Sequence, residues 1–166
     1  VLIIGTGIAG LYTALNLRED IRILMITKNK FRDCNSYLAQ GGISTSLGTF
    51  DEENYIKDTL KAGNYRNNKS AVKLLVKKSI ENIDNLVKIG VPFDRNEDKL
   101  RYTREGGHSE FRIVHVKDET GKAVMESLLN VVSQKSNVTM LEDTKLLDLI
   151  TKDNICYGGV LKNKEK

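Results

Sequence analysis

The first twenty-six residues constrain the fold of this chain more than any other stretch. Val1–Ile4 is a continuous apolar run that suits a central parallel strand buried on both faces. It leads into a glycine-rich turn, GTGIAG, at positions 5–10. Apolar spacing then predicts a helix over Ile8–Glu19, and the short apolar run Ile21–Ile26 predicts a second strand. This βαβ order indicates an α/β fold built on a parallel sheet.

The glycine spacing in the turn has a physical purpose. Gly5 permits a tight turn, Gly7 lets the backbone approach a pyrophosphate, and Gly10 lets the helix pack on the sheet. The N-terminus of the helix adds unpaired N–H groups and a positive potential. Because the motif follows a predicted strand and opens a predicted helix, it predicts a dinucleotide site. The residues expected to form it are Gly5, Thr6, Gly7, Ile8, Ala9 and Gly10.

The end of the second strand leaves the choice of dinucleotide open. The acidic residue that usually stands there and binds the adenosine ribose is absent, and Thr27-Lys28 take its place. A lysine at this point could favour the 2′-phosphate of NADP. The βαβ unit alone is therefore compatible with a nicotinamide or a flavin cofactor.

Composition excludes several other classes of function. The net charge is only +4, with 26 basic and 22 acidic residues scattered along the chain, so we expect no nucleic-acid partner. No apolar run approaches the ~18 residues that span a bilayer, so we expect no membrane insertion. Cys34 and Cys156 belong to no CxxC pattern, and no histidine pair completes a metal site, so we expect no metal and a reducing cytoplasm. The 166 residues favour one domain or part of one, and both ends suggest a piece of a longer protein.

The remaining chain alternates loops, helices and short strands. Residues 28–50 predict an ordered loop with a helical turn near Tyr37–Gln40, and apolar spacing predicts helices over Asp51–Ala62 and Lys69–Ile89, closed by Gly63 and Gly90 as C-terminal caps. The apolar positions of the second of these helices are Ala71, Leu74, Leu75, Ile80, Ile83, Leu86 and Val87. Further on we expect a turn at Arg95–Lys99 between two short strands, a helix capped by Asp118 or Thr120 that runs to about Gln134, and closing strands at Val138–Glu142, Leu146–Thr151 and Ile155–Leu161.

The loop NSYLAQGGI, over Asn35–Ile43, carries the most specific pattern. An AQGGI segment shortly after a GxGxAG βαβ unit resembles the flavoprotein superfamily of succinate dehydrogenases, fumarate reductases and L-aspartate oxidases. In that superfamily the loop lies along the flavin ring, and a Ser-Lys or similar pair replaces the acidic residue at the end of the second strand. The resemblance implies FAD, with contacts from Lys28, Asn35, Ser36, Tyr37, Leu38, Ala39, Gln40, Gly41 and Gly42. It also implies that the backbone near Lys145 and Leu146 passes the adenine.

Two features sort among the members of this superfamily. The membrane-bound dehydrogenases carry a histidine before AQGG that bonds covalently to FAD, whereas this chain has Asn35, so the resemblance implies noncovalent FAD. The segment TREGGHS at 103–109 resembles the corresponding segment of the L-aspartate oxidases. A carboxylate at Glu105 would pair with the ammonium that distinguishes aspartate from succinate. The alternative for Glu105 is a surface glutamate in a turn.

The segment Arg112-Ile113-x-His115-x-x-Asp118-x-Thr120-Gly121 also matches this superfamily. Both histidines of the chain, His108 and His115, fall in the matched segments. Each would either contact substrate or only orient a loop or a helix N-terminus.

The fold class implied is α/β: a partial Rossmann-like FAD-binding domain over 1–166, with a parallel sheet, flanking helices and a small antiparallel β-meander at the C-terminal end. A helical excursion at about 51–90 is expected, with the capping and C-terminal helical domains absent. The resemblance implies FAD-dependent oxidation of L-aspartate to iminoaspartate, the first step of de novo NAD biosynthesis through quinolinate. Oxygen or fumarate would reoxidise the flavin, and quinolinate synthase would take the product. We expect this chain alone to be inactive.

Two alternatives remain open at this point. One is a soluble fumarate reductase or succinate dehydrogenase flavoprotein. The other is a non-catalytic module that binds FAD or NADP.

Overall fold

The computed structural model describes residues 1–164, and the chain divides into two compact units. The first unit comprises Val1–Ala39 and Val124–Lys166, and the second comprises Gln40–Ala123. We call them the nucleotide unit and the loop unit.

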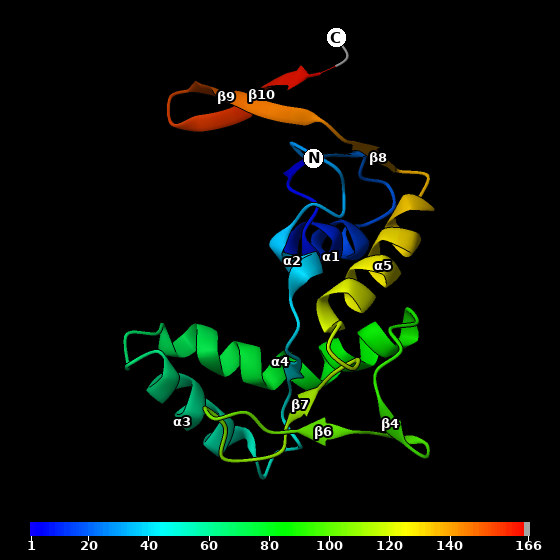
Figure 1. The fold of residues 1–166 in the computed structure, drawn as a ribbon. Helices are drawn as coiled ribbons and strands as arrows, with labels where there is room; N and C mark the ends of the chain where they lie inside the picture. The colour runs from blue at the N-terminus through cyan, green and yellow to red at the C-terminus, as the bar shows by residue number, and fades with distance from the viewer. Residues whose placement is uncertain (165–166) are drawn as a thin grey trace. The chain divides into compact units, whose positions relative to one another are not determined.

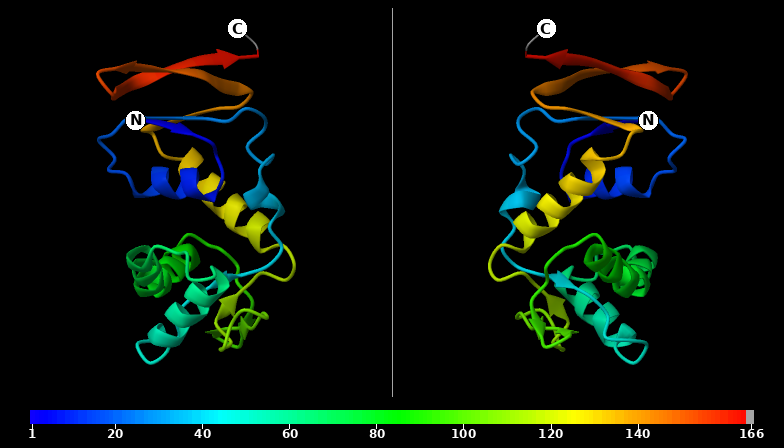
Figure 2. Two further views of the ribbon diagram at one scale, coloured as in Figure 1. Left: turned by 90° about the vertical axis from the view of Figure 1, so that its left-hand side faces the viewer. Right: turned by 90° about the vertical axis from the view of Figure 1, so that its right-hand side faces the viewer.

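The nucleotide unit is built on a parallel sheet of three strands. β1 (Leu2–Ile4), β2 (Ile23–Ile26) and β8 (Val138–Leu141) lie in the order β1-β2-β8. Figures 1 and 2 show α1 and α5 on one side of this sheet and the hairpin β9–β10 on the other. The helices are α1 (Ile8–Asn16), the short α2 (Asn35–Leu38) and α5 (Thr120–Ser133), of which α5 starts within the loop unit. Buried apolar residues of the unit come mainly from α1, β2 and α5.

The first strand differs from its expected position. β1 pairs only with β2 among the described residues and forms the edge of the sheet, and Ile4 is 53% exposed. The strand with neighbours on both sides is β2, where Ile23, Met25 and Ile26 are all buried. The expectation of a first strand buried on both faces was therefore wrong in the part of the chain that is described.

The C-terminal strands form a two-stranded hairpin. β9 (Thr144–Lys152) and β10 (Ile155–Asn163) pair antiparallel. Asp153 and Asn154 between them have φ values of 51° and 59°, as a type I′ turn requires. The third strand expected there, β8, joins the parallel sheet through its pairing with β2.

The loop unit combines two helices with short strands. α3 (Glu52–Ala62) and α4 (Lys69–Lys88) share a core of Tyr55, Val72 and Val76, against which Ile56 and Leu60 pack. β3 (Ile43–Ser44), β7 (Ile113–Val114) and β6 (Tyr102–Thr103) form a small antiparallel sheet in that order, which the sequence pattern did not predict. β4 (Arg95–Asn96) and β5 (Lys99–Leu100) form the hairpin expected around 95–99.

The helix ends show which capping predictions hold. Gly90 follows α4 with a φ of 91° and donates to the Val87 carbonyl, as a C-terminal cap does. Gly63 is the C-cap of α3 as predicted, and its N–H donates to the Thr59 and Lys61 carbonyls, but its φ is −83° and the left-handed positions fall on the next two residues. In α5 the first helical hydrogen bond runs from Ala123 to Glu119, so neither Asp118 nor Thr120 is the N-cap.

The buried face of α4 also differs from the expected apolar stripe. The buried positions are Val72, Val76, Ser79, Ile83 and Leu86, whereas the apolar Leu74, Leu75 and Ile80 are at least 41% exposed. Lys73, Lys77, Lys78 and Lys88 of the same helix are exposed. Among the residues that the structure describes, none of the helices is both long and apolar enough to cross a bilayer.

Candidate functional site

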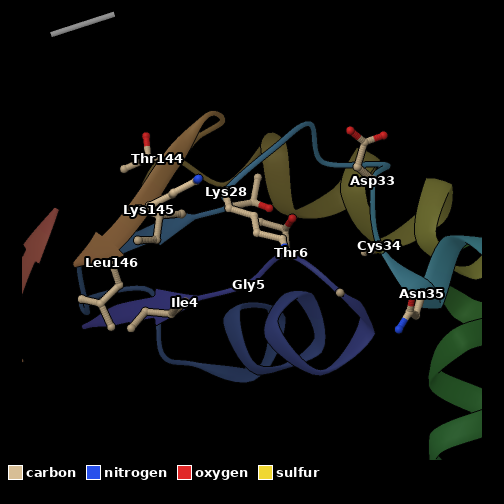
Figure 3. Close-up of a pocket in the computed structure, with 13 residues that line it drawn as sticks. Ile4, Gly5, Thr6, Lys28, Asp33, Cys34, Asn35, Thr144, Lys145 and Leu146 are labelled. Atoms are coloured by element: carbon tan, nitrogen blue, oxygen red, sulfur yellow. The ribbon is translucent and has the colours of Figure 1, made fainter. Parts of the chain in front are cut away.

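The nucleotide unit contains a cavity of about 510 Å³ at the carboxyl ends of β1 and β2, here called the nucleotide cavity. Its lining includes seven of the residues predicted to bind the cofactor: Gly5, Thr6, Gly7, Lys28, Asn35, Lys145 and Leu146. Figure 3 shows Ile4 and Leu146 at one end of this cavity and Asp33 and Asn35 at the other, with Thr6 and Lys28 between them. Ligands of open α/β sheets bind at this edge of the sheet.

Backbone hydrogen bonds hold the walls of the nucleotide cavity together. Gly5 turns with a φ of 101° and donates its N–H to the Ile26 carbonyl at 2.8 Å. At the end of β2, Thr27 accepts a hydrogen bond from the Thr144 N–H at 2.8 Å, which brings the start of β9 beside it. The predicted residues 5, 28 and 145 meet because three segments far apart in sequence are joined by main-chain bonds.

The start of α1 faces this cavity with little room for side chains. A β-carbon on Gly10 would collide with the Gly5 carbonyl, so the helix can approach the turn only without one. Gly7 is the N-cap of α1, and no side chain caps it. The first N–H groups of a helix lack partners within the helix and carry a partial positive charge. Of these, the Ile8 N–H reaches the Ser36 hydroxyl at 3.3 Å.

The loop after β2 is fastened by charged side chains. Lys30 bonds Asp143 at 2.6 Å, and Arg32 makes two bonds to Glu126 at 2.7 and 2.8 Å. The Tyr37 hydroxyl donates to the same glutamate at 3.1 Å. The hydrogen bonds and the charge of Glu126 hold the pKa of Arg32 above its usual value. The hydrogen bonds of Lys30, Arg32 and Tyr37 hold the segment that leads to α2 and to the NSYLAQGGI loop over Asn35–Ile43, here called the flavin-type loop.

The buried polar atoms of the nucleotide cavity indicate which ligand fits it. Thr6 is 2% exposed, and its hydroxyl has no hydrogen-bond partner among the described residues although Thr6 lines the cavity. An unpaired buried hydroxyl is unfavourable unless a ligand pairs with it. Together with the free N–H groups of α1 and the bare Gly7, this donor set fits a pyrophosphate. These residues therefore fit FAD.

Other predicted cofactor residues lie outside the lining of the nucleotide cavity. Ile8, Ala9 and Gly10 belong to α1, and Ser36, Tyr37 and Leu38 belong to α2, with Leu38 72% exposed. Ala39 is the last residue of the first segment of the nucleotide unit, and Gln40 opens the loop unit. The predicted loop thus passes from one unit into the other along the chain.

The loop unit has a second cavity, of about 380 Å³, here called the substrate cavity. It brings Gln40, Gly41 and Gly42 together with the TREGGHS segment. Its lining is Gln40, Gly41, Gly42, Asp94, Arg101, Thr103, Glu105, His115, Lys117 and Asp118. Six of these ten residues carry ionisable side chains.

Glu105 lies beside the glycine pair. A β-carbon added to Gly41 would be 3.5 Å from a carboxylate oxygen of Glu105. A β-carbon on Gly42 would collide with the Ile113 side chain and with the Val114 carbonyl of β7. Gly42 therefore lets the loop lie against β7, and the Glu105 carboxylate lies beside Gly41.

A buried ion network supports the segment that carries Glu105. Arg112 is fully buried and makes two hydrogen bonds to the equally buried Asp51, at 2.6 and 3.0 Å. It also bonds Asp58 of α3, which accepts the backbone N–H and the hydroxyl of Ser109 at 2.7 and 2.8 Å. The arginine thereby ties the end of TREGGHS to α3.

The same contacts shift the ionisation of the network. Burial alone would raise the pKa of Asp58, but hydrogen bonds from Ser109 and Arg112 outweigh it and lower that pKa. Burial alone would likewise lower the pKa of Arg112, and its bonds to Asp51 and Asp58 raise it instead. Both groups are held in their charged forms.

The two histidines have different surroundings. His108 Nδ1 lies 3.4 Å from Arg112, and its backbone N–H closes a turn onto the Glu105 carbonyl at 3.0 Å. His115 Nδ1 lies 3.4 Å from Asp94, and His115 lines the substrate cavity. Sequence reasoning singled out neither Asp94 nor Arg101 as a site residue, nor Thr144 of the nucleotide cavity. A signal existed only for Asp94, which ends the segment GVPFD at 90–94, another stretch that resembles the superfamily named above.

The described residues contain no cluster of three or more histidine, cysteine, aspartate or glutamate side chains that could hold a metal ion. Cys34 and Cys156 are both free.

Comparison with known proteins gives a consistent family. The model of the FAD binding domain family matches residues 1–166. L-aspartate oxidase of Clostridium acetobutylicum is 56% identical over 98% of this chain, and the match covers 38% of that protein. L-aspartate oxidase of Clostridium perfringens is 45% identical over 99% of this chain, covering 37% of that protein. The chain thus spans less than two fifths of the length of these curated relatives.

Solved structures show the same fold at lower identity. E. coli quinol fumarate reductase FrdA superposes with a TM-score of 0.92 at 23% identity, over 96% of this chain and 28% of that chain. Mycobacterium smegmatis Sdh1 in complex with UQ1 superposes with a TM-score of 0.86 at 24% identity, over 95% of this chain and 29% of that chain. At these identities the likeness establishes the fold alone.

Proposed function

The chain belongs to the FAD-binding domain family, and from that premise we propose that it is the N-terminal FAD-binding part of an enzyme that oxidises L-aspartate to iminoaspartate. Two L-aspartate oxidases that match nearly the whole chain at 56% and 45% identity support this substrate. The observation that carries the proposal is the carboxylate of Glu105 beside Gly41, on the glycine pair of the flavin-type loop.

The nucleotide cavity would hold the FAD pyrophosphate. Gly5 and Gly7 let the backbone approach the phosphates, the N-terminus of α1 supplies N–H donors, and the Thr6 hydroxyl gains a partner. Lys28 and Asn35 line the same cavity, and Lys145 and Leu146 line the side formed by β9, where the adenine is expected to pass. Ser36 to Gly42 would follow the flavin ring. FAD, when bound, would supply the acceptor for the hydride of the substrate, which carries the two electrons of the oxidation.

Attachment of the cofactor would be noncovalent. Asn35 stands where the covalent relatives carry a histidine, and an amide side chain is not a nucleophile of that kind. Affinity must then come from the contacts of the nucleotide cavity.

Glu105 would orient the substrate by its ammonium group. A carboxylate next to an ammonium makes a charge-assisted hydrogen bond, and succinate or fumarate has no cation at that position to pair with it. The negative charge of Glu105 is therefore the feature that distinguishes an amino-acid oxidase from a dicarboxylate dehydrogenase or reductase in this proposal.

The remaining partners are proposed from the same assignment. Oxygen or fumarate would accept the electrons of the reduced cofactor, and quinolinate synthase would consume iminoaspartate in de novo NAD biosynthesis. A cytoplasmic location agrees with two free cysteines in the described residues. Because the chain covers only 38% of the length of its Clostridium acetobutylicum relative, we expect the isolated 166-residue chain not to turn over aspartate.

The test compares two substrates in the FAD-loaded protein that contains this chain. L-aspartate added without oxygen should bleach the flavin absorbance, and Glu105→Gln should slow this by about a hundredfold, the loss of one charge-assisted contact. Fumarate reduction by the reduced protein should change much less. Equal losses in both reactions would reject the ammonium role, and a protein that aspartate never bleaches would reject the oxidase. Bleaching by succinate but not aspartate would instead identify a dicarboxylate dehydrogenase.

A further inference from the structure

The pair formed by Asp94 and His115 has no role in the function proposed above. His115 follows β7, and Asp94 lies just before the β4–β5 hairpin. Imidazole Nδ1 is 3.4 Å from a carboxylate oxygen of Asp94, and the Asp94 N–H donates to the His115 carbonyl at 2.8 Å. The carboxylate also accepts the Lys117 N–H, with both oxygens 3.4 Å from the nitrogen. Main-chain and side-chain contacts thus fix the carboxylate against one nitrogen of the ring.

The other ring nitrogen of His115 is left without a partner. Nε2 is buried and makes no hydrogen bond among the described residues, while the ring lines the substrate cavity with Glu105 and the glycine pair. A carboxylate on Nδ1 favours the tautomer with the proton on Nδ1, which leaves a lone pair on Nε2. A buried acceptor with no donor is unfavourable, so the arrangement is complete only when a ligand brings a donor.

We propose that His115 is the proton acceptor for the substrate ammonium, and that Asp94 is its positioning residue. This inference rests on the proposed oxidation of aspartate. Hydride can leave the α-carbon of aspartate only as the nitrogen lone pair forms the C=N bond, so the ammonium must first lose a proton. Among the residue types that line this cavity, histidine is the one whose charge changes near neutral pH, the property required of a general base.

The proton transfer balances without any other reactant. One N–H bond of the ammonium breaks, a bond forms between that proton and Nε2, and no electrons are gained or lost in this step. The imidazolium that results lies against the Asp94 carboxylate, which stabilises its charge. Glu105 holds the ammonium before transfer, and the flavin of the proposed function accepts the hydride afterwards.

Other charges border the same cavity and enter any pH profile. Glu105 and Asp118 are acidic, and Arg101 and Lys117 are basic. Of the acidic side chains, Asp94 lies against the imidazole, with a carboxylate oxygen 3.4 Å from Nδ1. The acid limb of the profile should therefore follow the histidine and its aspartate.

The experiment measures flavin reduction by saturating L-aspartate without oxygen, as a function of pH, in the FAD-loaded protein that contains this chain. For the unchanged protein the rate should fall at acid pH as the imidazole becomes protonated. His115→Gln should lower the rate at neutral pH by about 10² to 10⁴-fold and replace the limb of the imidazole with one at the higher pH where free aspartate titrates. Its rate should then rise with pH and approach that of the unchanged protein where aspartate itself loses the ammonium proton. Asp94→Asn should cost about tenfold in rate, because a neutral amide stabilises the imidazolium formed by proton transfer less than a carboxylate does.

Three controls separate this role from a structural one. Succinate lacks an ammonium, so its dissociation constant, read from the perturbed flavin spectrum, should change less than about twofold in His115→Gln. The FAD content of the purified variant should also be unchanged. His108→Gln removes the other histidine and should retain the acid limb.

Each other outcome decides against the inference. If the unchanged protein is not bleached by aspartate, the proposed function fails and the inference fails with it. If bleaching is normal but His115→Gln keeps its acid limb or stays within threefold in rate, only the inference is overturned. Loss of succinate or FAD binding in step with the rate would show a structural role and overturn it as well.

Discussion

The two cavities of this chain are lined by different kinds of chemical groups. The nucleotide cavity is formed by glycines, apolar strand ends and the unpaired Thr6 hydroxyl, and its charged side chains are those of Lys28, Asp33 and Lys145. The substrate cavity is formed largely by ionisable side chains, and a fully buried arginine network supports its TREGGHS segment. We therefore expect close approach of the main chain to contribute more to recognition in the first cavity, and placed charge to contribute more in the second.

The difference predicts what each unit tolerates. An added methyl group should be most harmful where backbone approaches backbone, as at the start of α1. Removal of a charge should be most harmful where ions are buried and paired, as around Arg112. Matched substitutions in the two units test whether this contrast is real.

The largest expected effect is on the buried arginine of the loop unit. Arg112→Met leaves the buried Asp51 without a cation and should lower the free energy of unfolding by about 3–5 kcal/mol, measured by urea titration. The matched change in the nucleotide unit is Arg32→Met, which breaks a pair whose side chains are 60% and 39% exposed. That loss should be much smaller and should shrink further in added salt. Similar losses for both variants would contradict the contrast.

The next largest effect is expected in the nucleotide unit, where a substitution should cost more than the matched substitution in the loop unit. Gly10→Ala places a methyl group against the Gly5 carbonyl and should cost about 1–3 kcal/mol of unfolding free energy, with weaker FAD binding, because α1 must move away from the turn. Gly106→Ala in the loop unit meets nothing within 4 Å and should stay within about 0.5 kcal/mol. Thermal melts with and without FAD would measure both variants. A tolerated Gly10→Ala would show that the turn is not closely packed.

These two units also differ in how far the sequence predicted them. The parallel βαβ unit and its glycine turn were predicted well, because a short strand, a turn and a helix are local and periodic. The neighbourhood of Gly41 and Glu105 was implied only by resemblance, since the two residues are 64 positions apart and meet through the β3–β7 pairing. Two-residue strands leave no periodic pattern to detect.

The errors have physical causes as well. In α4 the apolar spacing was real, yet Leu74, Leu75 and Ile80 are exposed while the polar Ser79 is buried, because it accepts the Ser46 N–H and donates to the Val76 carbonyl. A satisfied hydroxyl can therefore occupy a buried face that hydrophobicity alone would not assign to it. The role of Arg112 was missed for a similar reason, since its partners Asp51 and Asp58 lie more than fifty residues away.

A smaller effect is expected from the pH dependence of Asp58. Its pKa is lowered on folding, so its carboxylate stabilises the folded protein above the ordinary aspartate value of 3.8, and this contribution is lost as the pH falls through the lowered pKa. Asp58→Asn should therefore cost about 1 kcal/mol at pH 7, and the two proteins should converge in strong acid. Urea titrations from pH 7 downward would show it.

The matched aspartate of the nucleotide unit is Asp143. Its pKa is lowered by Lys164 and then by Lys30, whose side chains are 60% and 61% exposed. Asp143→Asn should therefore have an effect that added salt removes, whereas the effect of Asp58→Asn should persist in salt. If added salt reduced the effects of both variants equally, the ion pair of Asp58 would be as exposed to solvent as that of Asp143.

The smallest effect is expected at Thr6, and it should have opposite signs in the two states of the protein. Thr6→Val removes a buried hydroxyl that has no partner among the described residues, so the cofactor-free protein should be as stable as before or slightly more stable. If the hydroxyl bonds the FAD pyrophosphate, the same change should weaken FAD binding by about 0.5–1 kcal/mol, measured by calorimetric titration of the cofactor-free protein. Thr6→Ser keeps the hydroxyl and should retain most of the affinity. Equal FAD affinity in the valine and serine variants would show that the Thr6 hydroxyl takes no part in binding, so that backbone N–H groups carry the recognition of the pyrophosphate at this turn.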